Sequence, residues 1–149
     1  MKKLVCLLMV LLVMVSGAAV AEEKTALTFK RGEQLDVIDQ DGVKMYLTGD
    51  VEDNGVMVMA LEAIIENQTE HSIYIMSQGT GNGWALPCMK MGNGGTVVPA
   101  GSKAKSRLFI QYDACDVTSF RELETLDLQY MIYDSESTEL LFSTDNVLI

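Results

Sequence analysis

The stretch Gly55-Val-Met-Val-Met-Ala-Leu-Glu-Ala-Ile-Ile-Glu-Asn67 decides the fold class. Its odd positions are apolar from Met57 to Ile65, and its even positions from Val56 to Ile64 are apolar too, except at Glu62. Successive residues of a β-strand point to opposite faces. A strand that is apolar on both faces belongs in the middle of a sheet or has a partner surface across it.

On both sides of this stretch, apolar residues recur with a period of two rather than 3.6, which indicates half-buried strands. This pattern covers Val43–Val51 and Leu126–Ile132, and only Val117–Leu126 could hold a helical turn. Turns such as Asn82-Gly83 separate the segments at short intervals. The sequence predicts one all-β domain of eight or nine strands, an antiparallel sandwich, with a closed barrel as the competing architecture. Shorter candidate strands are Leu27–Lys30, Gln34–Ile38, Ser72–Met76, Arg107–Tyr112 and Glu139–Phe142.

Several of these segments resemble small secreted or lipid-anchored bacterial domains with an immunoglobulin-like fold and unknown function. The resemblance rests on a strand ending in an Asn-containing turn, an Asn-Gly-aromatic loop, and a Pro-Ala-Gly turn that opens the next strand. It implies an immunoglobulin-like β-sandwich and an extracytoplasmic location, and it carries over no catalytic residues. The segments are Leu61–Thr69, Ile73–Ile75, Asn82–Trp84, Val98–Lys103 and Leu126–Asp134.

The N-terminus has the composition of a secretory signal peptide. Lys2 and Lys3 precede the apolar run Leu4–Val15, and small residues follow up to Ala21. Because this run is shorter than the roughly 20 residues that span a bilayer, we expect cleavage after Ala21, with an uncleaved anchor as the alternative. The expected organisation is therefore a signal peptide at 1–21 and a secreted or cell-envelope domain at 22–149 without a stable membrane span.

Charge restricts the partners of this domain. The whole chain has 11 basic and 21 acidic residues, a formal charge of −10. Removal of residues 1–21 takes away two lysines and no acid, which leaves −12. Such a charge argues against nucleic acid or an anionic membrane surface as partner, because like charges would have to approach each other.

Two cysteines, Cys88 and Cys115, remain after cleavage. Export would allow them to form a disulfide, and the alternative is a pair of small buried apolar residues.

His71 is the sole histidine, so a Ser/His/Asp or Cys/His arrangement would need it. A histidine in a polar turn is more often solvated, and we expect no enzyme activity and no cofactor. The sequon Asn67-Gln68-Thr69 is expected to lie on the surface.

Trp84, the only tryptophan, follows the turn residue Asn82 closely. We expect its ring to fold back over the edge of the sandwich, as most tryptophans are largely buried. The alternative is an exposed ring that contacts a sugar or a peptide. On that alternative, Trp84 and Asn82 are the candidate partner-binding residues.

Two weaker patterns concern metals. Cys88, Met89 and Met91 place soft sulfur ligands together, which favours Cu(I) outside the cytoplasm, although Lys90 lies among them. A second pattern imitates the first half of a calcium loop, but the twelfth position is Leu61 instead of Glu. Its oxygen-bearing residues are Asp50, Glu52 and Asn54. We expect neither metal to be a resident cofactor.

Together these features predict a non-catalytic secreted or cell-envelope protein that binds a protein or glycan partner or serves a structural role. The alternative is an extracytoplasmic protein that binds copper or calcium.

Overall fold

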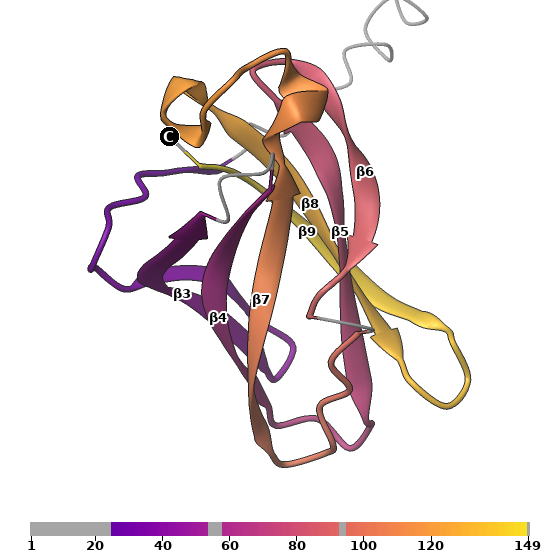
Figure 1. Cartoon of the computed structure of the whole chain (residues 1–149). Coiled ribbons are helices and arrows are strands. Elements are labelled where there is room, and N and C mark those ends of the chain that lie inside the picture. Colours follow the sequence, from indigo (N-terminus) through magenta and orange to yellow (C-terminus); the bar gives the residue numbers. More distant parts are fainter. Residues whose placement is uncertain (1–24, 54–57, 93–94, 149) are drawn as a thin grey trace, which may run out of the picture.

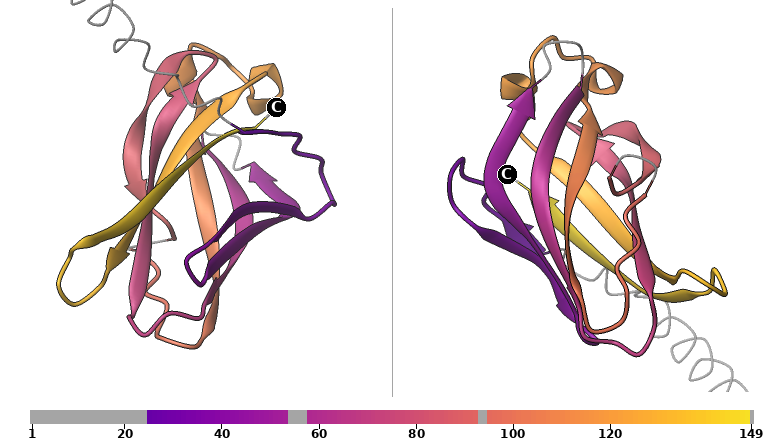
Figure 2. Two further views of the ribbon diagram at one scale, coloured as in Figure 1. Left: turned by 180° about the vertical axis from the view of Figure 1, so that it is seen from behind. Right: turned by 60° about the horizontal axis from the view of Figure 1, so that its bottom comes forward.

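The structure is a computed structural model that describes residues 25–53, 58–92 and 95–148. They form nine strands in two facing sheets (Figures 1 and 2). The five-stranded sheet has the order β1 (Thr25–Leu27), β9 (Leu140–Leu148), β8 (Leu126–Asp134), β5 (Ile73–Gly81) and β6 (Trp84–Lys90). The four-stranded sheet has the order β2 (Leu35–Gln40), β3 (Val43–Asp53), β4 (Val58–Asn67) and β7 (Lys103–Gln111). Two 3-10 turns, η1 (Tyr112–Cys115) and η2 (Phe120–Glu122), connect β7 to β8.

The predicted β-sandwich is confirmed, and the closed barrel is wrong because the strands divide into two sheets. Paired strands are antiparallel except β1 and β9, which are parallel. The chain crosses between the sheets after β1, after β4, after β6 and after β7. Such crossings are typical of Greek-key sandwiches.

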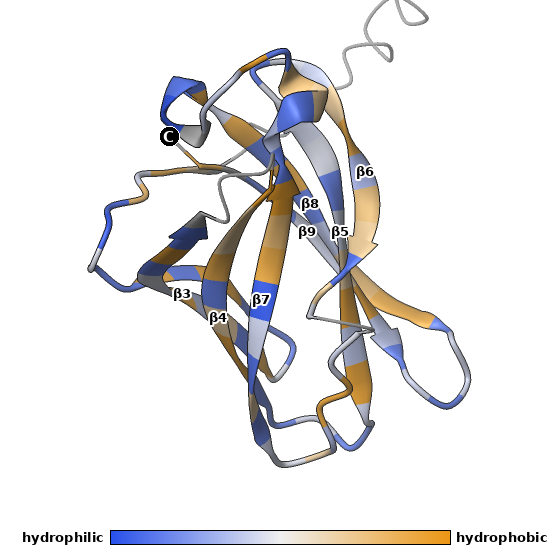
Figure 3. Ribbon diagram, in the orientation of Figure 1, coloured by the Kyte–Doolittle hydropathy of each residue, from blue (hydrophilic) through white to orange (hydrophobic). Residues whose placement is uncertain are grey.

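Strand β4 has the central position that its composition predicts, between β3 and β7. Its residues at 59, 61, 63 and 65 are buried in the core, and its outward residues lie between the side chains of both neighbours. Figure 3 shows polar and apolar residues alternating along the strands of this sheet. The first two apolar residues of the predicted stretch, Val56 and Met57, lie outside the described residues.

The outer face of the four-stranded sheet carries cross-strand ion pairs. Lys103 contacts Glu66 at 2.7 Å, and Lys105 contacts Glu62 at 3.2 Å. Charged side chains on an edge strand such as β7 also discourage pairing with strands of other molecules. Each exposed pair contributes at most about 1 kcal/mol, so these contacts mainly keep this face solvated.

One end of the sandwich is held together by the side chain of Asn67, which is 1% exposed. Its Nδ2 group donates to the carbonyl oxygens of His71 at 2.7 Å, Val98 at 2.9 Å and Pro99 at 3.2 Å. Its Oδ1 accepts from the backbone N–H and the hydroxyl of Thr69. We call this the Asn67 end. The expectation that the whole sequon lies on the surface is wrong for Asn67, whose amide is already used inside the fold.

A second amide joins the two sheets directly. Asn146 on β9 donates to the carbonyl oxygen of Val37 at 3.0 Å. Val37 is the extra residue of a bulge in β2, because Asp36 pairs with Tyr46 and Ile38 with Met45. A bulged residue is left out of the ladder. The inward-facing Asn146 therefore provides the partner that the sheet does not.

Among the described residues, there is no helix with the length and apolar composition needed to cross a membrane. The predicted signal peptide, 1–21, lies outside the described residues.

Replacement of Asn67 by Ala should lower the free energy of unfolding by roughly 3 kcal/mol, because several buried backbone groups lose their partner. Chemical denaturation of the purified protein measures this loss. The neighbouring exposed residue supplies the control, since Gln68→Ala should change stability by less than about 0.5 kcal/mol. Equal effects of the two substitutions would show that the Asn67 amide does not hold this end together.

Candidate functional site

The opposite end of the sandwich is organised by the β5–β6 hairpin. Its turn residues Asn82 and Gly83 both have positive φ, 48° and 82°, as a two-residue hairpin turn of the primed type requires. The Asn82 side chain donates to the carbonyl oxygen of Glu122 at 2.9 Å and accepts from the backbone N–H groups of Glu124 and Thr125. Asn82 therefore holds the segment 122–125 against the hairpin, and its amide is occupied by this structural role.

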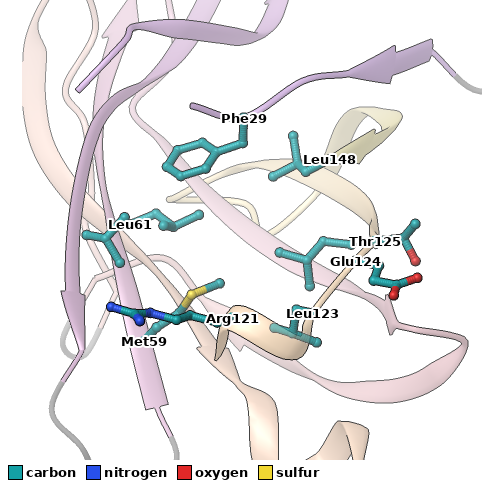
Figure 4. Close-up of a pocket in the computed structure, with 10 residues that line it drawn as sticks. Phe29, Met59, Leu61, Arg121, Leu123, Glu124, Thr125 and Leu148 are labelled. Carbon is teal, nitrogen blue, oxygen red and sulfur yellow. The ribbon is translucent and has the colours of Figure 1, made fainter. Parts of the chain in front are cut away.

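The segment held by Asn82 forms one wall of an apolar recess between the two sheets (Figure 4). The cavity has a volume of about 220 Å³. Val51, Met59 and Leu61 come from the four-stranded sheet, and Leu126 and Leu148 come from the five-stranded sheet. The recess is completed by Phe29, Arg121, Leu123, Glu124 and Thr125. We call this part of the molecule the recess end.

Two charged residues line the recess. In Figure 4 the side chain of Arg121 extends beside Met59, whereas the Glu124 carboxylate lies on the other side and points away from the cavity. Within the described residues, Arg121 takes part in no ion pair, although Lys30, Lys44, Lys103, Lys105 and Arg107 all do. The recess thus combines apolar walls with one unneutralised guanidinium group.

Trp84 starts β6 at the same end, and the expectation that it packs as a plug is wrong. Its side chain is 54% exposed, the most exposed of the large apolar residues described. The residues that follow, Ala85 and Pro87, are exposed as well, and Leu86 is half-buried. Since β6 is an edge strand, these side chains form an apolar border beside the recess end.

The outer face of the five-stranded sheet contains a second aromatic group, which is less suited to binding. The rings of Tyr74 and Tyr133 stack with centroids 5.2 Å apart, and the Lys90 ammonium lies 4.0 Å from the Tyr74 centroid. Tyr74 therefore has one ring face against Tyr133 and contacts a cation as well. Trp84 is the stronger candidate for contact with a partner.

The predicted disulfide is absent, because Cys88 and Cys115 are both free. Cys115 is buried, and burial raises the pKa of its thiol. Its sulfur lies beside Gly81, where a Cβ atom would collide with it. Gly81 pairs with Trp84, and Cys88 lies four residues further along β6, about 13 Å away at 3.3 Å per residue. Because the Cys115 sulfur lies beside Gly81, this spacing along β6 separates the two cysteines, and a disulfide spans only about 7 Å between Cα atoms.

The sulfur ligands of the copper alternative are also separated. Adjacent residues of a strand point to opposite faces, so Cys88 and Met89 diverge, and Met91 is buried in the core. For the calcium alternative, Glu52 binds Arg107 at 2.9 Å, Asp50 is exposed, and Asn54 lies outside the described residues. The described part of the chain holds no group of three or more His, Cys, Asp or Glu residues that could bind a metal ion.

His71 contacts a carboxylate near the Asn67 end. Its Nδ1 atom is 2.7 Å from a carboxylate oxygen of Asp134. Asp134 accepts backbone hydrogen bonds from Ser137 and Glu136, and these bonds, helped by His71, hold the pKa of its carboxyl below the ordinary value. Because Asp134 pairs with Ile73, this pair lies at the end of the sheet opposite the recess. Its geometry stabilises the β8–β9 turn.

Neither the family models nor the curated proteins include a match to this chain. Among solved structures, it is similar to a Northeast Structural Genomics Consortium target determined by X-ray crystallography, with 13% identity and a TM-score of 0.31 over 78% of this chain and 81% of that one. It is also similar to the alkylpurine DNA glycosylase AlkC of Pseudomonas fluorescens bound to DNA containing an abasic site analog, with 14% identity and a TM-score of 0.29. That match covers 93% of this chain and 33% of the other. Both scores are too low to support an argument about function.

The free thiols can be counted with a thiol-specific reagent. The folded protein should react at Cys88 and leave Cys115 protected, because only Cys88 is exposed. Both thiols should react after denaturation. Two protected thiols in the denatured, unreduced protein would show that the disulfide forms after all.

Proposed function

We propose that the protein is a non-catalytic binding domain that acts outside the cytoplasm and contacts a protein or a glycan through the surface around Trp84. The proposal includes export by the leader 1–21 and membership of the small secreted immunoglobulin-like domains that the sequence resembles. The observation that carries it is the exposure of the only tryptophan on an apolar edge strand.

An exposed tryptophan suits a binding role for a physical reason. Its ring offers a large contact area with few rotatable bonds, so little conformational entropy is lost when a partner covers it. Tryptophan is correspondingly enriched among the residues that contribute most to interfaces. Asn82 supports this role indirectly, since it fixes the hairpin from which Trp84 projects.

The strand that carries Trp84 lacks the acidic residues that are abundant in the rest of the chain. β6 contains no acidic residue and has one base, Lys90, although the chain as a whole has a charge of −10. An anionic partner therefore meets less repulsion at β6 than elsewhere on this acidic chain. A neutral partner that covers β6 buries few charged side chains. A neutral glycan or a protein with an apolar patch fits this surface.

Photo-cross-linking tests the proposal in the producing cell. The full chain is expressed with p-benzoyl-phenylalanine in place of Trp84, and in a second variant in place of Val97, which is 49% exposed near the Asn67 end. We expect position 84 to yield one cross-linked protein or glycan species outside the cytoplasm, joined to a chain that begins at Glu22, and position 97 to yield none.

Competition separates binding from chance contact. Unlabelled wild-type protein should suppress the cross-link, and the Trp84→Ala variant should need at least about tenfold higher concentration, as expected for an interface tryptophan. Equal cross-linking from positions 84 and 97, or equal competition by wild type and Trp84→Ala, would overturn the proposed surface. Protein retained in the cytoplasm with Met1 intact would overturn the proposed export.

A further inference from the structure

The size of the recess indicates what it can hold. An engineered cavity of about 150 Å³ lined by aliphatic and aromatic residues binds benzene, a six-carbon ring. The recess has about 220 Å³ and seven apolar lining residues, drawn from both sheets and from their connections. In proportion, it accommodates an apolar group of roughly eight or nine carbon atoms.

The guanidinium group of Arg121 is placed to bind the polar end of such a ligand. Arg121 lies on η2, in the connection between β7 and β8, and its side chain borders the recess next to Met59 (Figure 4). Among the described residues, only Arg31 and Arg121 are cations without an ion-pair or ring partner, and Arg31 does not line the recess. A guanidinium presents paired donors that match a carboxylate.

We propose that the recess binds a small amphipathic carboxylate, with its aliphatic chain between the sheets and its carboxylate on Arg121. A cationic ligand would face Arg121, and the only carboxylate among the lining residues, on Glu124, points away from the cavity in Figure 4. This inference goes beyond the proposed function, because it uses neither Trp84 nor a macromolecular partner.

The architecture explains why the cavity stays open. Its sheet walls are paired strands, and its third wall, the segment 122–125, is held by three hydrogen bonds to the Asn82 side chain. Asn82 is thus a positioning residue for this site. It fixes the backbone of Glu124 and Thr125, and it is not among the residues that line the recess.

Methyl NMR of the purified protein, labelled at the methionine methyl groups, provides a direct test with octanoate as the probe. Met59 lines the recess, whereas Met45 is fully buried elsewhere in the core and serves as an internal control. We expect a saturable shift of the Met59 signal with a Kd of about 0.1–1 mM, the range expected for a ligand of about ten heavy atoms. The Met45 signal should not move.

The two unpaired arginines form a matched pair of variants. Arg121→Gln should weaken octanoate binding about fivefold, as expected for loss of a partly exposed charge pair, and leave the binding of 1-octanol unchanged. Arg31→Gln should affect neither ligand. Octylammonium should bind more weakly than octanoate.

The remaining outcomes overturn the inference. They are the absence of a saturable Met59 shift at about 10 mM octanoate, equal weakening by Arg121→Gln and Arg31→Gln, and 1-octanol binding as tightly as octanoate. None of these results depends on cross-linking from position 84, so failure of the recess proposal and failure of the proposed function can be told apart.

Discussion

The buried amide of Asn67 is the interaction on which the arrangement of the two sheets depends. It connects the last residue of β4 with the turn before β5 and with the Val98–Pro99 segment before β7. Backbone bonds between Ile73 and Val98 and from Asn67 to Ser102 reinforce the same corner. Hydrogen bonds shielded from water are strong and costly to leave unmade, so this end has one stable arrangement. The chain can cross from one sheet to the other there without leaving buried backbone groups unpaired.

The recess end is held together by weaker contacts than the Asn67 end. The candidate site lies at this more weakly held end. There the organising amide belongs to Asn82, which is exposed, and its hydrogen bonds compete with water. The sheets are joined there by short 3-10 turns, by the segment 122–125 and, two residues before Leu148, by the buried hydrogen bond from Asn146 to Val37. Apolar side chains from both sheets therefore border a cavity, and Trp84 projects from the adjoining edge strand. A rigid end and an open end are a common arrangement for a binding module on a β-sandwich, since loops and strand ends carry recognition while the sheets supply the scaffold.

The sequence was sufficient for the fold where periodicity was clean, as in the central position of β4 and the half-buried β8. It failed for β6, because Trp84 to Met89 is apolar without alternation and contains Pro87, which an edge strand tolerates. The sequence pattern also ended β9 too early, since the polar residues after Phe142 hide the inward-facing Asn146 and Leu148.

The candidate site was only partly predictable. Trp84 and Asn82 stood out by residue type, but the recess gathers residues from five separate parts of the chain that no local pattern connects. The sequon at Asn67 was a misleading signal, because the same amide that suits a surface turn can be consumed by buried carbonyl groups.

Residue-resolved amide hydrogen exchange of the unliganded protein tests this contrast between the two ends most directly. The N–H groups of Asn67, Ile73 and Val98 should exchange only through global unfolding, because they are bonded and buried at the Asn67 end. Those of Glu124 and Thr125, bonded to the exposed Asn82, should exchange through local opening, with a free energy at least about 2 kcal/mol lower. Equal protection at both ends, or greater protection at 124 and 125, would contradict the account.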